Sequence, residues 1–236
     1  MPEIQIINGD CLEEIQKLKE NSIDAVITDP PYNVSRDTNF HTMKGRRGST
    51  MDFGEWDKGC EITEFIHYLP RVLKENSNVV IFNSWQNIKE IADECERNNI
   101  TIKRCLVLNK SNPAPFNRDR LFVNDVEFAI WGIYNSKKKP TKWTFNRTNK
   151  YEKCVIDTKV ISKKHHPTSK DPDVIDYLIN TLTNEGDTVL DPFLGGGTTM
   201  LCCQKLNRNG VGIELEEKYY ETSKKRLEEI TKKAWQ

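Results

Sequence analysis

Four consecutive residues near the start of the chain carry groups that could activate an aromatic amine. The apolar segment from Asp24 to Thr28 is typical of a strand, and Asp29-Pro30-Pro31-Tyr32 follows it directly. The Asp29 carboxylate and the Pro30 carbonyl could accept both hydrogens of an exocyclic amino group and free the nitrogen lone pair. Tyr32 could stack on the ring. A rigid structural turn is the alternative, because Pro-Pro ends a strand and Asp starts turns.

A second junction of this kind carries a glycine-rich turn. A short strand over 188–190 leads into Asp191-Pro192-Phe193-Leu194-Gly195-Gly196-Gly197, and a helix is expected from Thr198. Glycines let the backbone approach a ligand closely because they lack a Cβ. The next strand ends at Glu214, roughly 20 residues after Asp191, which is the spacing of a carboxylate that accepts hydrogen bonds from a ribose. The alternative for Glu214 is an ordinary charged residue at the start of the last helix.

Two classes of cofactor could use such a turn. A dinucleotide requires a third glycine in the pattern G-x-G-x-x-G, and here Thr198-Thr199 follow the glycines instead. The Asp191 carboxylate would also repel a pyrophosphate, whereas it could hold the positive amino group of a methionine. The sequence therefore favours S-adenosylmethionine over NAD.

Strand-like and helix-like segments alternate, which predicts an α/β sheet with helices on both faces. The expected strands are 4–7, 24–28, 78–82, 105–108, 127–134, 188–190 and 210–213, and the expected helices are 11–19, 62–73, 88–98 and 198–206. The strands over 105–108 and 127–134 are expected to pair at one edge. Two irregular segments, 35–58 and 135–164, interrupt this alternation, and we interpret them as loops that face the substrate rather than as plain surface insertions.

Composition limits the remaining choices. The chain has 236 residues with 35 basic and 35 acidic side chains, so a uniformly basic coat for nucleic acid is excluded, but one basic face is not. Neither a signal peptide nor an apolar run of about 20 residues is visible, which predicts a cytoplasmic protein without a membrane span. Seven cysteines without a Cys-x-x-Cys pair, beside His165-His166, fit a metal site poorly, so no metal is expected.

Together these motifs resemble the β-class of DNA amino-methyltransferases, in which the catalytic motif precedes the glycine-rich motif. The resemblance covers nearly the whole chain. Asn8-Gly9-Asp10-Cys11 looks like the family segment that contacts the adenine of the cofactor, and His166-Pro167-Thr168-Ser169-Lys170 looks like the H-P-T-Q-K segment beside its methionine end. Residues 110–115 are similar to a segment of small adenine-specific members. Ser169 in place of glutamine and Gly196 in place of serine depart from the family pattern and put the cofactor affinity in doubt.

The resemblance implies a Rossmann-like methyltransferase fold in a single domain over 1–236, with a mostly parallel sheet and one antiparallel edge strand. Asp29, Pro30, Pro31 and Tyr32 would be catalytic. The residues expected to contact S-adenosylmethionine are Asp10, Cys11, Asp29, His166, Pro167, Thr168, Ser169, Lys170, Asp191, Pro192, Phe193, Gly195, Gly197, Thr198, Glu214 and Leu215. The residues expected to contact DNA phosphates or base edges are Arg36, Lys44, Arg46, Arg47, Lys110, Asn112, Asn117, Arg118 and Arg120.

The activity implied is methyl transfer from S-adenosylmethionine to the N6 atom of an adenine flipped out of DNA. Asp at position 29 favours adenine, because cytosine-N4 members more often begin this motif with Ser. A cytosine-N4 enzyme, a catalytically silent nucleic-acid-binding subunit, and an enzyme acting on a protein glutamine or an RNA base are the alternatives. A homodimer and a cognate restriction endonuclease are partners compatible with the resemblance.

Overall fold

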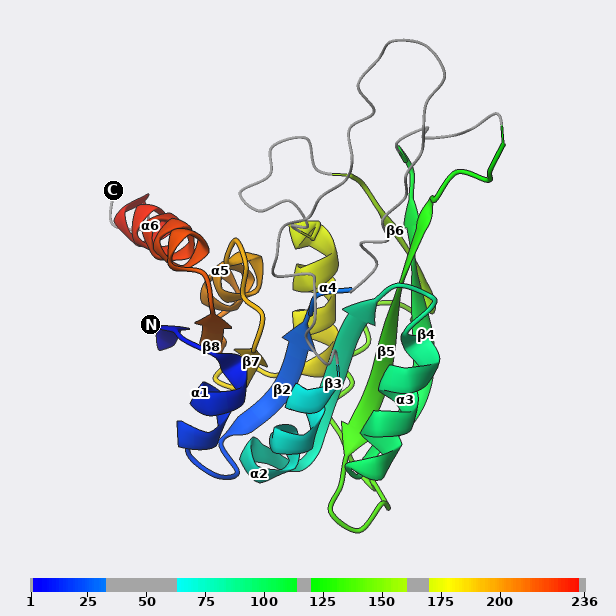
Figure 1. Cartoon of the computed structure of the whole chain (residues 1–236), viewed down its shortest axis with the longest axis horizontal. Helices are drawn as coiled ribbons and strands as arrows, with labels where there is room; N and C mark the ends of the chain where they lie inside the picture. Colours follow the sequence, from blue (N-terminus) through cyan, green and yellow to red (C-terminus); the bar gives the residue numbers. More distant parts are fainter. Residues whose placement is uncertain (1, 33–62, 114–119, 161–169, 234–236) are drawn as a thin grey trace.

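The computed structural model describes residues 2–32, 63–113, 120–160 and 170–233 (Figure 1). Within them, the strands form one eight-stranded sheet in the order β1-β8-β7-β2-β3-β5-β4-β6. The strands are β1 (Ile4–Asn8), β2 (Ile23–Thr28), β3 (Leu73–Asn83), β4 (Ile100–Lys110), β5 (Val126–Tyr134), β6 (Val155–Thr158), β7 (Thr188–Asp191) and β8 (Asn209–Glu214). The helices are α1 (Cys11–Lys17), the 3-10 helix η2 (Glu64–Tyr68), α2 (Leu69–Val72), α3 (Ile88–Arg97), α4 (Pro172–Leu182), α5 (Thr198–Lys205) and α6 (Glu217–Lys233).

One strand of the sheet runs against the others. β5 is antiparallel to both β3 and β4, whereas the other neighbouring strands pair in parallel. The predicted mostly parallel sheet with helices on both faces is confirmed. The predicted position of the antiparallel strand at an edge is wrong, because β6 pairs with the outer side of β4 and β5 lies inside the sheet. β6 falls within the segment 135–164 that the sequence suggested to be irregular.

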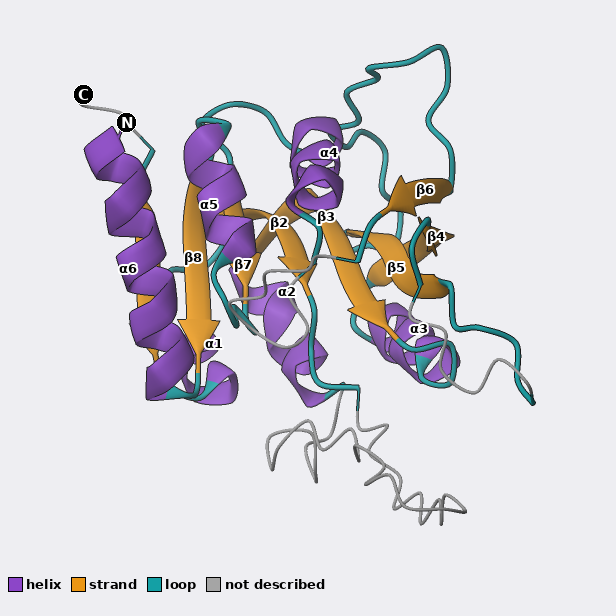
Figure 2. Ribbon diagram, turned by 90° about the horizontal axis from the view of Figure 1, so that it is seen from above, coloured by secondary structure: helices purple, strands orange, loops and turns teal. Residues whose placement is uncertain are grey.

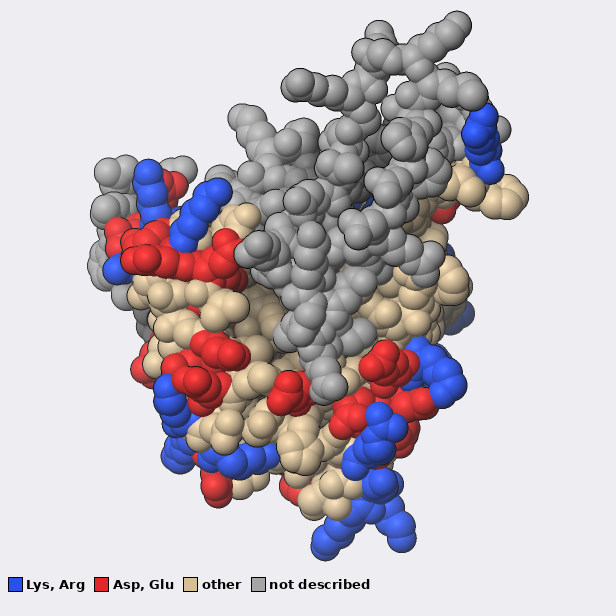
Figure 3. All heavy atoms as spheres, viewed as in Figure 1, with Lys and Arg blue, Asp and Glu red and all other residues tan. Residues whose placement is uncertain are grey.

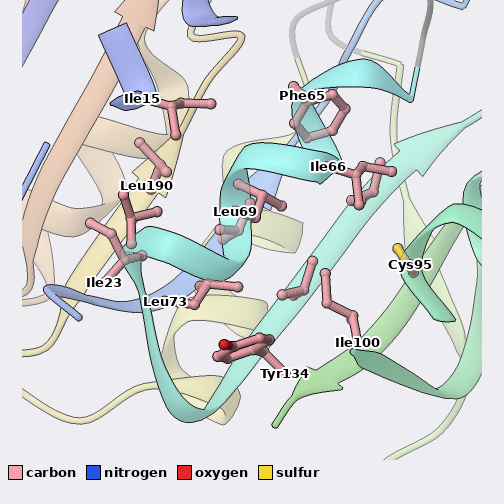
Figure 4. Packing of buried hydrophobic residues seen from close by; sticks show 14 of the residues in the cluster. Ile15, Ile23, Phe65, Ile66, Leu69, Leu73, Cys95, Ile100, Tyr134 and Leu190 are labelled. Carbon is pink, nitrogen blue, oxygen red and sulfur yellow. The ribbon is translucent and has the colours of Figure 1, made fainter. Parts of the chain in front are cut away.

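Two layers of helices cover the sheet (Figure 2). On one face, α1, η2, α2 and α3 pack over a cluster of apolar side chains that includes Ile15, Phe65, Leu69 and Ile91, each at most 1% exposed. Figure 4 shows part of this cluster, in which side chains from α1 and the η2–α2 segment point toward the strands. On the other face, α4, α5 and α6 pack over a second cluster. The central strands β2, β3 and β7 bury residues on both of their faces, as expected for strands covered by helices on both sides.

Two elements differ in extent from the expectations. The expected helix over 62–73 is a 3-10 helix followed by a single α-helical turn, in which a proline occupies the first turn of α2. The expected strand over 78–82 begins five residues earlier at Leu73, where polar residues hid it. None of the helices in the described ranges is long and apolar enough to span a membrane.

The strand order creates a switch point between β2 and β7. The chain leaves β2 toward β3 on one side, and it leaves β7 toward β8 on the other side. Connections that diverge in this way open a crevice at the carboxyl ends of the strands, where open α/β sheets bind ligands. Asp29 follows β2 directly and Asp191 ends β7, so the two predicted motifs border this crevice.

Candidate active site

The Asp29 carboxylate is held at both of its oxygens. Tyr32 donates its hydroxyl hydrogen to Asp29 Oδ1 at 2.7 Å, and Lys170 Nζ lies 2.6 Å from Oδ2. Lys170 also donates to the Tyr32 hydroxyl oxygen at 2.9 Å. The side chains of Lys170 and Asp29 are only 10% and 17% exposed. The three groups therefore form a compact, mostly buried triangle at the end of β2.

A second carboxylate extends this triangle from the neighbouring part of the sheet. Glu127 Oε2 lies 3.3 Å from Lys170 Nζ, and Glu127 Oε1 lies 2.7 Å from Lys110 Nζ. Glu127 is the second residue of β5, which is antiparallel, so it lies at the edge where the parallel strands end. Lys110, Glu127, Lys170 and Asp29 thus form a chain of four alternating charges.

These contacts set the protonation states. Burial raises the pKa of Asp29, and the Lys170 ammonium opposes this rise. Burial also disfavours the charged form of Glu127, but Lys170 and Lys110 outweigh it and lower its pKa to about 2. Burial works against the charge of Lys170 as well, but its anionic neighbours, first Asp29, raise its pKa well above the usual value. At neutral pH Glu127 is an anion and Lys170 is a cation.

The loop after β3 fixes the backbone of the predicted catalytic motif, residues 29–32. Asn87 donates from Nδ2 to the carbonyl of Tyr32 at 2.7 Å and to Asn83 Oδ1 at 2.8 Å. Asn83 ends β3 and is fully buried, so it anchors this link to the sheet. Sequence reasoning missed Asn83, Asn87 and Glu127. For Glu127 the available signal was an acidic residue at the start of an apolar strand, and for Asn83 and Asn87 no local pattern pointed to a site.

The Asp191 carboxylate connects the two strands that border the crevice. Asp191 Oδ1 accepts hydrogen bonds from Thr28 Oγ1 at 2.8 Å and from the amide of Phe193 at 3.2 Å. The side chain is only 4% exposed, and burial raises its pKa to about 6. Asp191 is therefore mostly ionised at neutral pH, and it holds the turn in place in addition to its predicted role toward a positive amino group.

The Glu214 carboxylate ties the glycine-rich turn to the end of β8. Glu214 Oε2 accepts from the amide of Gly195 at 2.7 Å, and Oε1 accepts from the amide of Glu216 at 2.8 Å. Gly9 and Asn8 donate to the Glu214 carbonyl, which places the first predicted cofactor segment beside this carboxylate. A carboxylate offers about four lone-pair positions, so Glu214 retains the capacity to accept from ribose hydroxyls.

Glycine is required at one position of the turn. Gly197 has φ +80°, in the left-handed region that other residues rarely adopt. A Cβ placed there would lie 2.9 Å from Ser223 Cβ, so α6 packs directly against the turn. The partly exposed Gly195, with the carboxylates of Asp191 and Glu214 near it, suits a ligand that carries a ribose and a positive amino group. S-adenosylmethionine has both.

The other predicted cofactor residues follow these elements. Asp10 caps α1 by accepting a hydrogen bond from the amide of Leu12 at 2.9 Å, and Cys11, the first residue of α1, is buried. Phe193 packs edge-to-face on Phe65 at 5.0 Å between ring centroids. Pro192 lies in the described turn, Thr198 opens α5, and Leu215 is 65% exposed just after Glu214. His166, Pro167, Thr168 and Ser169 lie outside the described residues.

The predicted DNA contacts divide into three groups. Arg36, Lys44, Arg46, Arg47, Asn117 and Arg118 lie outside the described residues. Arg120 is exposed, and Asn112 exchanges hydrogen bonds with the backbone of Val160. Lys110 is paired with Glu127, so its ammonium belongs to the network of charges around Asp29. In the described part of the chain no group of His, Cys, Asp and Glu could hold a metal ion.

A family model described as DNA methylase matches residues 23–225. The chain belongs to the DNA methylase family. It is 31% identical to the type II methyltransferase M.HinfI of Haemophilus influenzae over 249 residues, which cover 95% of this chain and 68% of that protein. It is also 31% identical to M2.DpnII of Streptococcus pneumoniae, with coverage of 94% and 89%.

Solved structures place this DNA methylase in the same group. The complex of M1.HpyAVI with S-adenosylmethionine superimposes with a TM-score of 0.74 at 37% sequence identity, and it covers 94% of this chain and 99% of that chain. The predicted kind of enzyme, an S-adenosylmethionine-dependent DNA methyltransferase, is confirmed. The roles of individual site residues remain predictions.

Proposed function

We propose that this DNA methylase, acting as one methyltransferase domain, methylates N6 of an adenine flipped out of DNA. The observation that carries this proposal is the buried Asp29 carboxylate, held by Lys170 and Tyr32 at the end of β2. The glycine-rich turn and Glu214 lie across the switch point from it. An amino acceptor and a ribose acceptor on the two sides of one crevice suit a base and S-adenosylmethionine meeting between them.

The protein residues would act mainly by positioning. S-adenosylmethionine supplies an electrophilic methyl group on a positively charged sulfur. The Asp29 carboxylate would accept one hydrogen of the amino group and the Pro30 carbonyl the other, which draws the nitrogen lone pair out of the ring. Asp29 already accepts from Tyr32 and Lys170, and about two of its lone-pair positions remain for the amino group. Buried polar groups that need no reorientation stabilise such a transition state most effectively.

Adenine is favoured over cytosine by the residue type at position 29. The carboxylate of Asp29 is a stronger acceptor than the hydroxyl that begins the motif in many cytosine-N4 members. A cytosine-N4 activity is therefore the second candidate.

The DNA would lie across the edge where the parallel strands end. Arg120, Leu121 and Phe122 are exposed just before β5, and β5, whose second residue is Glu127, starts at this edge. Figure 3 shows basic and acidic side chains interspersed on the described part of the neighbouring face, below this edge. We assign the phosphate contacts mainly to the segment 35–58, because it is rich in Lys and Arg. Residues in the segment 135–146 form hydrogen bonds with Asn76, Asn78 and Asn99, near the amino end of β3 and away from the proposed DNA edge. Of the segment 135–164, we therefore propose only residues 147–164 as facing the DNA.

The same proposal includes the setting of the enzyme. Cytoplasmic DNA would be its substrate, and a homodimer and a cognate restriction endonuclease are the expected protein partners. Light scattering of the purified protein tests the dimer.

Substitution of Asp29 tests the proposed function. In Asp29→Ala we expect methyl transfer to be lost while S-adenosylmethionine binding falls only partly, because the adenosine end of the cofactor is held elsewhere. Asp93→Asn, an exposed acid on α3, is the matched control and should behave as wild type. Near-normal turnover of Asp29→Ala would overturn the proposal.

A further inference from the structure

Lys170 contacts every ionisable group of the catalytic motif, although its sequence context associates it with the cofactor. Its ammonium nitrogen lies 2.6 Å from Asp29, 2.9 Å from the Tyr32 hydroxyl and 3.3 Å from Glu127. The next residue, Asp171, caps α4 and accepts from Thr158 Oγ1 at 3.1 Å. This anchor fixes the backbone from which the Lys170 side chain reaches the pocket.

A buried carboxylate without a partner tends to take up a proton rather than remain charged. A protonated Asp29 would present a hydrogen to the target amino group at one oxygen and would lose much of its acceptor strength. The charged groups around Asp29 are Lys170, Glu127 and Asp191, with the Tyr32 hydroxyl. Among them, Lys170 is the cation, and the negative charges of Glu127 and Asp191 act in the opposite direction.

Glu127 holds the Lys170 ammonium in place, but it does not draw this ammonium away from Asp29. Its second oxygen is occupied by Lys110 at 2.7 Å, and its contact with Lys170 is longer than the contact between Lys170 and Asp29. Both Glu127 and Lys110 project from paired strands, β5 and β4, so this support is rigid. The ammonium is therefore held between two carboxylates and lies closer to the catalytic one.

We propose that Lys170, held by Glu127, is the counter-ion that keeps the buried Asp29 carboxylate charged and oriented toward the target base. The proposal rests on the proposed function, since it assumes that Asp29 accepts from the amino group. Lys170 and Glu127 act through Asp29 and are positioning residues. This assignment moves Lys170 from the cofactor side of the crevice to the substrate side.

The two residues have opposite electrostatic effects, which makes the proposal testable. Loss of the Lys170 charge raises the pKa of Asp29, so the fall in rate at acid pH should begin at a higher pH. Loss of the Glu127 charge lowers the pKa of Asp29, so the same fall should begin at a lower pH. A cation within about 4–6 Å lowers a carboxyl pKa by roughly 1–3 units, which sets the size expected for Lys170.

The experiment is the pH dependence of the single-turnover methyl-transfer rate with saturating S-adenosylmethionine and unmethylated DNA. The acid limb is the part of this pH profile in which the rate falls as the pH is lowered. In Lys170→Met the midpoint of the acid limb should move up by roughly 1–3 pH units. Lys170→Arg should leave the limb close to that of wild type. Glu127→Gln should move it down, with a lower plateau because Lys170 is less fixed. Lys89→Met, which removes an exposed ion-paired lysine on α3, is the matched control.

Titration of each variant with S-adenosylmethionine separates this role from a cofactor role. We expect the dissociation constant to change less than about threefold in Lys170→Met. An unmoved acid limb, or a limb that moves the same way in Lys170→Met and Glu127→Gln, would overturn the proposal. Should Lys170→Met fail to fold, the downward shift in Glu127→Gln is the deciding result. Loss of the proposed function itself would show separately, as activity that survives Asp29→Ala.

Discussion

Glu214 offers a quantitative test of where the ribose binds. Its carboxylate accepts from two backbone amides, at 2.7 Å from Gly195 and 2.8 Å from Glu216, and the residue is 9% exposed. Glu214→Ala removes both bonds and the acceptor for the ribose hydroxyls. A hydrogen bond to a charged group contributes about 1.5–3 kcal/mol. The loss of the ribose bonds should therefore weaken S-adenosylmethionine binding by roughly 10- to 150-fold.

Glu214→Gln sharpens this prediction because it removes charge while it keeps size. The amide has one oxygen, so it can accept from only one of the two backbone amides and turns its own hydrogens toward the other. We therefore expect Glu214→Gln to be far from conservative. It should weaken cofactor binding and lower the unfolding temperature even without the cofactor, because the turn loses an acceptor.

Calorimetric titration with S-adenosylmethionine, together with thermal unfolding of the free protein, measures both effects. Glu217→Gln, an exposed acid in the first turn of α6, serves as the control for charge alone. Binding by Glu214→Ala within twofold of wild type would refute the assignment of the ribose to the end of β8.

Three further changes test other parts of the site. Asn87→Ala removes the 2.7 Å bond to the Tyr32 carbonyl and should slow single-turnover methyl transfer about tenfold with cofactor affinity unchanged; an unaltered rate would contradict the anchoring role. Gly197→Ala forces a Cβ into φ +80° and against Ser223, and it should lower the free energy of unfolding by at least about 1–2 kcal/mol in urea titrations; equal midpoints would contradict this. Asp191 has a folded-state pKa of about 6 against an ordinary value of 3.8, so its contribution to stability falls as pH rises between these values. The free energy of unfolding of Asp191→Asn relative to wild type should therefore rise from pH 4 to pH 6 and then stay constant. A difference that does not change with pH would contradict the raised pKa of Asp191.

The positions of Asp29, Asp191 and Glu214 followed from one rule. Each residue lies at or just after the carboxyl end of a parallel strand, and short runs of mostly apolar residues before them made those strands visible. Their hydrogen-bond partners were not visible, because Thr28, Gly195 and Tyr32 are ordinary residues whose contacts depend on the fold. The rule placed these three residues at the crevice, but it did not predict which hydrogen bonds they form there.

Glu127 shows why the rule missed part of the site. It lies at the beginning of β5, and an antiparallel strand brings its first residues to the edge where parallel strands end. A search restricted to strand ends passes over such a residue. Lys110 was interpreted as a DNA contact for a related reason, since its partner lies on a neighbouring strand 17 positions away, and no local pattern pairs them.

β6 was missed because its signal is short. Only four residues, Val155–Thr158, form it, and the surrounding segment is basic and polar. Its pairing with β4 makes β6 the edge strand of the sheet. β5 lies between β3 and β4 even without β6, so the error in the position of the antiparallel strand came from the order of β4 and β5, which the apolar pattern of two pairing strands does not specify.

The central claim is that the crevice between β2 and β7 presents an adenine amino group to S-adenosylmethionine. The most direct measurement is mass spectrometry of nucleosides from unmethylated genomic DNA after incubation with the protein and methyl-labelled S-adenosylmethionine. Label in N6-methyladenine, lost with Asp29→Ala, is the predicted result. Label in N4-methylcytosine would replace adenine with cytosine as the target. Label in neither nucleoside, with a folded protein that binds the cofactor, would contradict the account.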